Sequence, residues 1–174
     1  MKKIIISFSV FYLLSCTSFK NELLQDGTNE NAVKNAIIDF SNNSNLFKKD
    51  KSFTIRIKEV NEGFLGVSIL GTNNKVYYFT ESNENFLPNK CIEYKGKLFY
   101  WRDYNSPQDN KVVEKLHSYQ LIDSVPSFAS TTGIIDDGKK GMDYFFCKNN
   151  FLKYKKVKTS IGLGYYKAPV LKCD

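Results

Sequence analysis

Residues 53–58 read Phe-Thr-Ile-Arg-Ile-Lys, so that large apolar side chains alternate with polar ones. Successive side chains of a strand point to opposite faces of a sheet, and this period of two therefore predicts a half-buried β-strand. A turn at residues 61–63 (Asn-Glu-Gly) leads into a second apolar run over 64–70. Another turn at 71–74 leads into a run over 75–80, which predicts a three-stranded antiparallel meander.

Two more hairpins are predicted further along the chain. One spans 92–102 around the turn Lys95-Gly96, and the other spans 144–158 around the turn 148–150. In each hairpin, two runs that contain aromatic and aliphatic residues flank residues that favour turns. The sequence leaves open whether residues 165–171 form a further strand.

Two helices are predicted, over about 28–41 and 107–118. In the first helix, apolar residues recur at helical spacing, namely Val33, Ala36, Ile37 and Phe40. Thr28-Asn29 offers a capping side chain at its start. The second helix is indicated by Ser106-Pro107, because a serine cap followed by a proline in the first turn is typical of a helix start.

These elements predict one α+β domain over residues 29–174. Its expected architecture is a mainly antiparallel sheet of six to eight strands that carries the two helices. The chain has 174 residues, which suits one domain with a real core better than two.

Aromatic residues stand in consecutive runs along several of the predicted strands, which places large rings on both faces of the sheet. In the run that contains the only tryptophan, we expect Phe99 and Trp101 to face the core. Tyr100 would then share the opposite face with Tyr78 and Tyr94. That face is either covered by helices or displayed to a ligand or partner, in which case these tyrosines are the candidate binding residues.

The N-terminus has the pattern of a cleaved secretory signal. Met1-Lys2-Lys3 is a short basic start, and residues 4–14 form an apolar run interrupted only by serines. Eleven helical residues rise only about 16 Å, which is too short to cross a bilayer core. We therefore expect residues 1–15 to be removed as a signal peptide.

The boundary at residues 13–16 (Leu-Leu-Ser-Cys) resembles the lipobox of bacterial lipoproteins. The resemblance implies cleavage before Cys16, which would carry a thioether-linked diacylglycerol and an amide-linked acyl chain such as palmitate. Residues 16–28 would then form the lipidated N-terminus and a tether. Thr17, in place of the aspartate that retains lipoproteins at the inner membrane in enterobacteria, implies the outer membrane, on its periplasmic or surface face.

Three cysteines remain once Cys16 is acylated, and export would place them in an oxidising compartment. Three pairings are open from the sequence. We favour a disulfide between Cys147 and Cys173, because both lie in the C-terminal strand region. Cys91 would then be a small buried apolar residue.

The charge pattern argues against a nucleic-acid partner. The formal net charge is +7, but Arg56 and Arg102 are the only arginines and all other basic residues are lysine. Readers of nucleic acid and phosphate favour the planar arginine fork. A lysine-rich surface better suits solubility or nearness to anionic lipid headgroups.

No catalytic or metal-binding constellation is expected, and no cofactor. His117 is the only histidine, and its helix position beside the apolar stripe indicates a solvent-facing residue. The paired acids, such as Glu59 with Glu62, lie in predicted turns that give them no fixed separation. The cysteines lack the spacing of a zinc site.

These observations favour a lipid-anchored cell-envelope protein with a non-catalytic binding role, of the inhibitor or immunity type. Its expected partners are the membrane, through the N-terminal lipid, and an envelope or secreted protein. The alternatives are a lipoprotein that binds a glycan or small ligand on an aromatic sheet face, and a structural component of the envelope.

Overall fold

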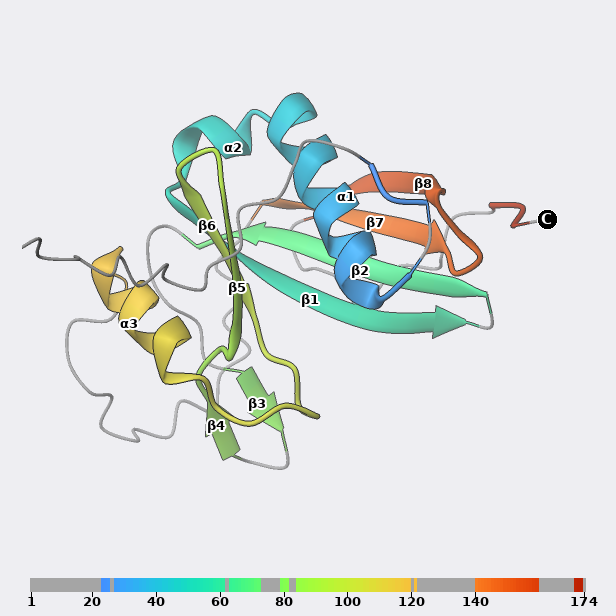
Figure 1. Ribbon diagram of the computed structural model, residues 1–174. Coiled ribbons are helices and arrows are strands. Elements are labelled where there is room, and N and C mark those ends of the chain that lie inside the picture. The colour runs from blue at the N-terminus through green and yellow to red at the C-terminus, as the bar shows by residue number, and fades with distance from the viewer. Residues whose placement is uncertain are drawn as a thin grey trace, which may run out of the picture.

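A six-stranded mixed sheet frames the structure (Figure 1), in the strand order β5-β6-β1-β2-β7-β8. The computed structural model describes residues 23–25, 27–61, 63–72, 79–81, 84–119, 121, 140–159 and 171–173. Its helices are α1 (Asn29–Asn43), α2 (Leu46–Lys49) and α3 (Asn110–Ser118). Its strands are β1 (Ser52–Asn61), β2 (Phe64–Gly71), β3 (Phe79–Glu81), β4 (Glu84–Phe86), β5 (Lys90–Tyr94), β6 (Lys97–Trp101), β7 (Gly141–Cys147) and β8 (Asn150–Thr159).

The predicted α+β class is confirmed, and three hairpins build the main sheet. β1 and β2 pair antiparallel with Ile55 opposite Ile69, as the alternation in β1 predicts. The hairpins β5–β6 and β7–β8 also form where the sequence predicts them. The sheet is mixed because β6 joins β1 in parallel, which sets Phe99 opposite Phe53.

The predicted meander is wrong at its third strand. Residues 79–81 form β3, which pairs only with β4 in a separate two-stranded sheet, and residues 75–78 lie outside the described residues. The place beside β2 belongs to β7. Every residue of β7 is buried, and a strand that buries both faces gains more apolar contact in the sheet interior than at an edge.

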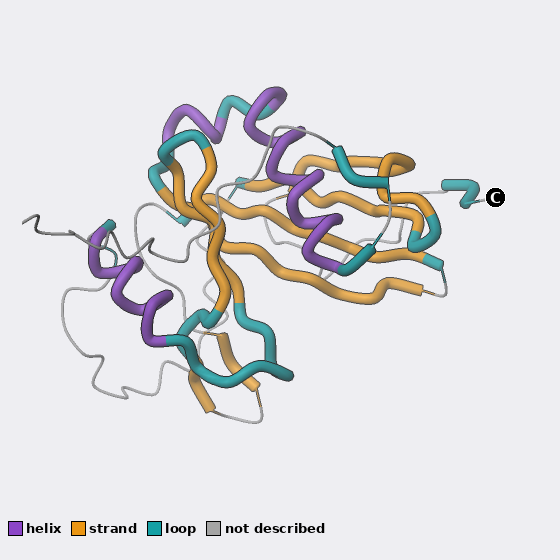
Figure 2. The backbone as a smooth tube through the Cα atoms, viewed as in Figure 1, coloured by secondary structure: helices purple, strands orange, loops and turns teal. Residues whose placement is uncertain are grey.

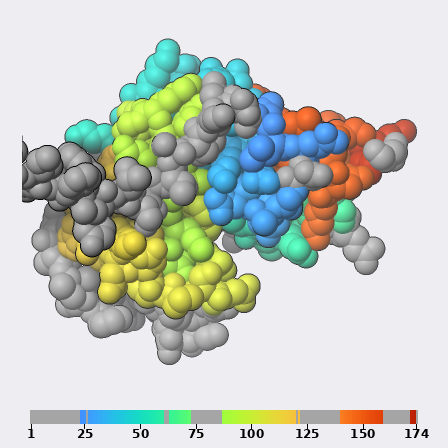
Figure 3. Space-filling view, in the orientation of Figure 1, coloured from blue at the N-terminus to red at the C-terminus, as the bar shows by residue number. Residues whose placement is uncertain are grey.

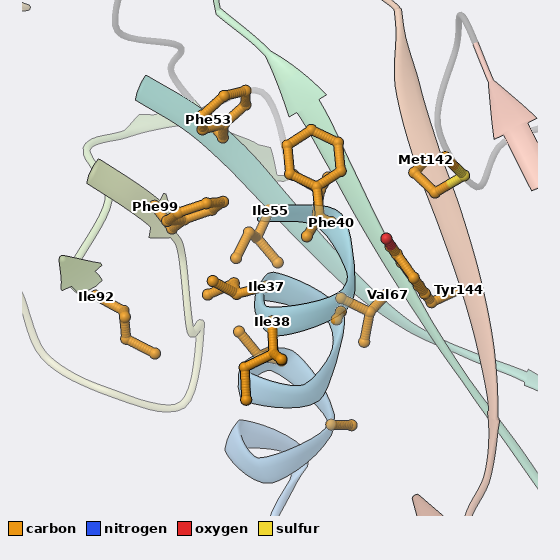
Figure 4. Packing of buried hydrophobic residues seen from close by; sticks show 14 of the residues in the cluster. Ile37, Ile38, Phe40, Phe53, Ile55, Val67, Ile92, Phe99, Met142 and Tyr144 are labelled. Atoms are coloured by element: carbon orange, nitrogen blue, oxygen red, sulfur yellow. The ribbon is translucent and has the colours of Figure 1, made fainter. Parts of the chain in front are cut away.

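Helix α1 covers one face of the sheet, which we call the α1 face (Figures 1 and 4). Figure 4 shows Ile37 of the helix beside Ile55 of β1, with the Phe40 ring further along the helix on the side of Phe53. The Phe40 ring meets the Phe53 ring edge-on, with centroids 5.1 Å apart. This cluster is the main hydrophobic core, and its burial is the principal force that holds the fold together.

Helix α3 packs on the opposite face, which we call the far face, where it covers β6 (Figure 2). Val112 and Leu116 of the helix form a second cluster with Leu98 and Tyr100. The helix begins three residues later than the sequence predicts, because Asp109 is its cap and accepts a hydrogen bond from the Lys111 amide at 2.9 Å.

The ends of α1 also differ in detail from the prediction. Thr28 occupies the cap position, but its side chain makes no capping hydrogen bond. The helix continues through the polar stretch to Asn43, and the short helix α2 follows, which the sequence does not predict. α2 forms because Phe47 docks on the core, where its ring stacks 6.0 Å from Phe53.

Among the described residues, every helix is too short or too polar to cross a membrane.

Candidate functional site

The predicted orientation of the tryptophan run is confirmed for its core-facing residues. Phe99 and Trp101 lie in the main core on the α1 face. The Phe99 ring stacks on Phe53 with centroids 5.0 Å apart, which the parallel register of β6 with β1 makes possible. The alternation along a strand therefore predicts the facing of this run correctly.

The three candidate tyrosines do not form one displayed surface. Tyr100 faces the far side as predicted, but it is fully buried beneath α3. Tyr94 lies on the α1 face, where it is only 6% exposed, and Tyr78 lies outside the described residues. Tyr94 and Tyr100 thus point to opposite faces, which corrects the expectation that they share one.

A buried carboxylate on α1 is the most heavily bonded polar group that the structure describes. Asp39 projects from α1 toward β7 and β8, where the Tyr144 hydroxyl donates to Oδ2 and the Tyr154 hydroxyl to Oδ1, both at 2.9 Å. Lys156 Nζ donates to both oxygens at 2.9 and 2.8 Å. Asn43 Nδ2, one helical turn later, donates to Oδ1 at 2.8 Å.

The electrostatics of this cluster keep the carboxylate ionised and the tyrosines protonated. Burial acts to raise the pKa of Asp39, but the hydrogen bonds from Lys156, Tyr154 and Tyr144 and the Lys156 charge outweigh it and hold the pKa below its usual value. Burial and the neighbouring Asp39 charge raise the pKa of Tyr144. The same effects raise the pKa of Tyr154 to about 12.

The Asp39 cluster is suited to holding elements together. Both carboxylate oxygens already accept hydrogen bonds from several donors, and a carboxylate has only about four acceptor positions. The cluster therefore joins α1 to β7 and β8, and Lys156 is its solvent-exposed member.

Asn35 makes a second polar junction, one turn before Asp39 on the same helix. Its side chain accepts a hydrogen bond from the Leu24 amide at 2.9 Å and donates to the Leu24 carbonyl at 2.6 Å and to the Phe151 carbonyl at 3.2 Å. The Phe151 amide in turn donates to the Gln25 carbonyl at 2.5 Å. The segment just before α1 is therefore fixed against the first residues of β8.

The C-terminal residues reach the same hairpin. Cys147 and Cys173 form the predicted disulfide, with Cα atoms 5.4 Å apart. Asn149 Nδ2 donates to the Cys173 carbonyl at 3.0 Å. Both ends of the described chain are thus attached at the β7–β8 turn.

Cys91 differs from its expected role as a buried thiol. Its side chain is half-buried at the second cluster, and it is disulfide-bonded, with the other sulfur outside the described residues.

Sequence reasoning missed Asn35 and Asp39, although a signal was present. The two residues stand four apart, a helical spacing, and each adjoins residues of the apolar stripe. The apolar spacing alone does not show their role, because it is the docking of β7 and β8 that buries α1 over residues 35–40.

The far face holds a different kind of polar group. The hydroxyls of Thr54 on β1 and Ser68 on β2 are buried, and neither has a hydrogen-bond partner within the described part of the chain. Asp143 on β7 lies directly opposite Ser68 in the strand register and is fully buried. Three small or acidic polar side chains therefore lie on the same face of three adjacent strands, with Thr54 two register positions along from the Ser68–Asp143 pair.

The remaining candidates lie at the surface. His117 is exposed on α3, as its position in the helix predicts. Glu59 is exposed and pairs with Lys148 at 3.1 Å. Among the described residues, no group of three or more metal-ligating side chains converges.

Comparison with models of protein families, with curated proteins and with solved structures found no match for this chain.

Proposed function

We propose that this protein is a lipid-anchored component of the cell envelope whose folded domain binds a partner without catalysing a reaction. The observation that carries the anchoring is the lipobox-like boundary at residues 13–16, placed where the apolar signal segment ends. Leu23 is the first described residue after Cys16. At about 3.5 Å per residue, the intervening chain reaches at most about 25 Å, so the domain would stay close to the bilayer.

Two further observations support this placement. Disulfides persist in exported proteins and are rare in a reducing cytosol, and Cys147 is bonded to Cys173. Thr17 after the acylated cysteine favours the outer membrane, on its periplasmic or surface face.

The binding role is supported by the way the fold uses its polar groups. Asp39 and Asn35 are saturated by contacts that fix α1 and the N-terminal segment to the β7–β8 hairpin. A disulfide and these junctions make a rigid scaffold, which lowers the entropy that a protein loses when it binds a partner. A preformed surface of this kind would suit an inhibitor or immunity-type module.

Anchoring is tested by replacing the proposed lipidation residue. The Cys16→Ser variant should lose acylation, remain unprocessed or soluble, and leave the detergent phase in which the wild type collects. The double variant Cys147→Ser with Cys173→Ser is the matched control, because it removes two cysteines that bond to each other and leaves residues 13–16 unchanged. Equal partitioning of wild type and Cys16→Ser would contradict the proposal.

A partner is tested by cross-linking in intact cells, followed by purification of the lipoprotein and mass spectrometry of the adducts. The wild type should yield one defined envelope or secreted protein, and the unanchored Cys16→Ser variant should yield less of it. Adducts that contain only this chain, or a different random set in each repeat, would contradict a specific binding role.

The far face favours a second candidate function, the binding of a small polar ligand such as a sugar. A buried hydroxyl without a hydrogen-bond partner destabilises the folded protein. A bound ligand that hydrogen-bonds to Thr54 and Ser68 would remove this cost. Under this hypothesis, Ser68→Ala keeps or gains stability but loses a ligand-induced rise in melting temperature. A panel of sugars that raises the melting temperature of neither protein would count against this candidate.

A further inference from the structure

Two exposed leucines flank the point where the proposed lipid tether meets the domain. Leu23 immediately precedes the segment that Asn35 and Phe151 hold, and it is 48% exposed. Leu152 immediately follows Phe151 on β8 and is 44% exposed. Apolar side chains left open beside a membrane anchor are suited to entering the headgroup layer of that membrane.

Strand β8 adds positive charge along the same edge. Its sequence is Asn-Phe-Leu-Lys-Tyr-Lys-Lys-Val-Lys-Thr, without an acidic residue. Lys153, Lys155 and Lys158 are exposed on the strand, and Lys156 beside them pairs with Asp39. Among the described strands, β8 pairs only with β7 and forms the end of the sheet.

The surface view shows how these parts adjoin. In Figure 3 the blue surface of the N-terminal segment and α1 meets the orange surface of β7 and β8. The hydrogen bonds from Asn35 to Leu24 and Phe151 fix this contact. The tether would therefore leave the domain beside the lysines of β8 and not beside α2 or α3.

We propose that the tether patch, formed by Leu23, Leu152, Lys153, Lys155 and Lys158, lies against the anionic headgroups of the membrane that holds the lipid. This inference rests on the proposed lipid anchoring. The lysine ammonium groups contact lipid phosphates while the two leucines enter the interface beneath them. The domain thus has one fixed membrane-facing edge, and α3 at the other end of the sheet points away.

The charge and the tether position together select lipid over a protein partner. An acidic protein could also bind the lysines, but it would have to compete with a membrane surface held within about 25 Å of them by the short tether. The tether lets the lysines come within a Debye length of the surface, roughly 8–10 Å, where an anionic leaflet adds an affinity gain of roughly fivefold for each lysine.

The test uses the full lipidated protein, reconstituted in vesicles of neutral phosphatidylcholine or of the same lipid with phosphatidylglycerol. Brief acetylation followed by mass spectrometry reports the reactivity of each lysine. Lys153, Lys155 and Lys158 should react several-fold more slowly on anionic vesicles, and 1 M salt should restore their reactivity. Lys49 on α2 and Lys111 on α3 are exposed internal controls and should react equally on both vesicles.

A matched pair of variants isolates the patch. In the wild type, the neighbouring Lys172 should also be protected, meaning that it is acetylated more slowly on anionic vesicles. Lys153→Gln combined with Lys155→Gln and Lys158→Gln should abolish this protection. Lys48→Gln combined with Lys49→Gln and Lys111→Gln removes the same charge elsewhere and should leave that protection intact. All six positions are exposed, so folding is expected to survive both sets.

The outcomes separate this inference from the anchoring on which it rests. A protein that does not stay with vesicles of either kind overturns the anchoring itself. A vesicle-bound protein whose β8 lysines react equally on both lipids overturns the membrane-facing edge. Protection that appears only in native envelope membranes, and not on anionic vesicles, also overturns it and assigns the edge to a protein.

Discussion

Asp39 shows how one residue joins three elements. A carboxylate inside the buried part of α1 is stable there because Tyr144, Tyr154 and Lys156 donate to it from β7 and β8. We expect Asp39→Ala to lower the free energy of unfolding by about 2–3 kcal/mol, since the buried Tyr144 hydroxyl would lose its acceptor. Urea denaturation measures the loss, and Asp109→Ala, which removes only a helix cap, should cost about 1 kcal/mol.

The same carboxylate predicts a pH dependence. The pKa of Asp39 is lower in the folded protein than its usual value of 3.8, so the folded state binds its proton more weakly. Its contribution to stability is therefore complete above that usual value and is lost as the pH falls through the folded pKa. The stability difference between wild type and Asp39→Asn should shrink between pH 5 and pH 2, and a difference that is constant with pH would contradict this role.

Tyr100 was predictable in its direction but not in its exposure. Alternation along β6 fixes the face to which a side chain points, whereas burial depends on where α3 docks, which local sequence does not encode. We expect both Tyr100→Ala and Trp101→Ala to cost about 3–5 kcal/mol, where the sequence alone predicts a cheap Tyr100→Ala. Tyr104→Ala, at a position 45% exposed, is the control and should change stability by less than about 0.5 kcal/mol.

At the scale of elements, hairpins were predictable and their partners were not. The Lys95-Gly96 turn has φ values of 49° and 70°, the conformation that a two-residue hairpin loop requires. Such turns act over a few residues and are visible in the sequence. The pairing of β2 with β7 joins residues far apart in the chain, and it depends on total burial and not on any local pattern.

Gly96 and Gly141 are required for different reasons, the first for the backbone conformation of a turn and the second for close packing between strands. A Cβ at Gly96 would touch nothing, so Gly96→Ala meets only the cost of its positive φ, about 1 kcal/mol. A Cβ at Gly141 would lie 2.5 Å from the Ile69 carbonyl oxygen of β2, and backbone there cannot yield cheaply. We expect Gly141→Ala to cost about 3 kcal/mol or more, and thermal melts that rank the two variants the other way would contradict this packing.

The disulfide joins the chain end to β7. Its cysteines are 26 residues apart, and closing a loop of that length contributes about 3 kcal/mol in the chain-entropy model. Replacing Cys147 and Cys173 together by alanine should lower the free energy of unfolding by about that amount, and Asn149 would lose its fixed acceptor. A double variant as stable as the wild type in urea would contradict a stapling role.

At the scale of the whole molecule, the α+β class and the two main helices followed from period and spacing. The parallel junction of β6 with β1 did not, because it depends on the contact between Phe53 and Phe99, which lie side by side on the two strands and are far apart in sequence. The candidate site was predictable only in part. The disulfide was found from the positions of its cysteines, whereas the junctions at Asn35 and Asp39 need the docked hairpin before their roles appear.

Mass spectrometry of the N-terminal peptide, taken from protein isolated with the cell envelope, tests the central claim of lipid anchoring most directly. We expect the mature chain to begin at Cys16 and to carry the added mass of a diacylglycerol and an amide-linked acyl chain. The thioether to the diacylglycerol uses the sulfur of Cys16, so an acylated Cys16 cannot also form a disulfide. A chain that begins elsewhere, or a Cys16 found unmodified or in a disulfide, would contradict the account.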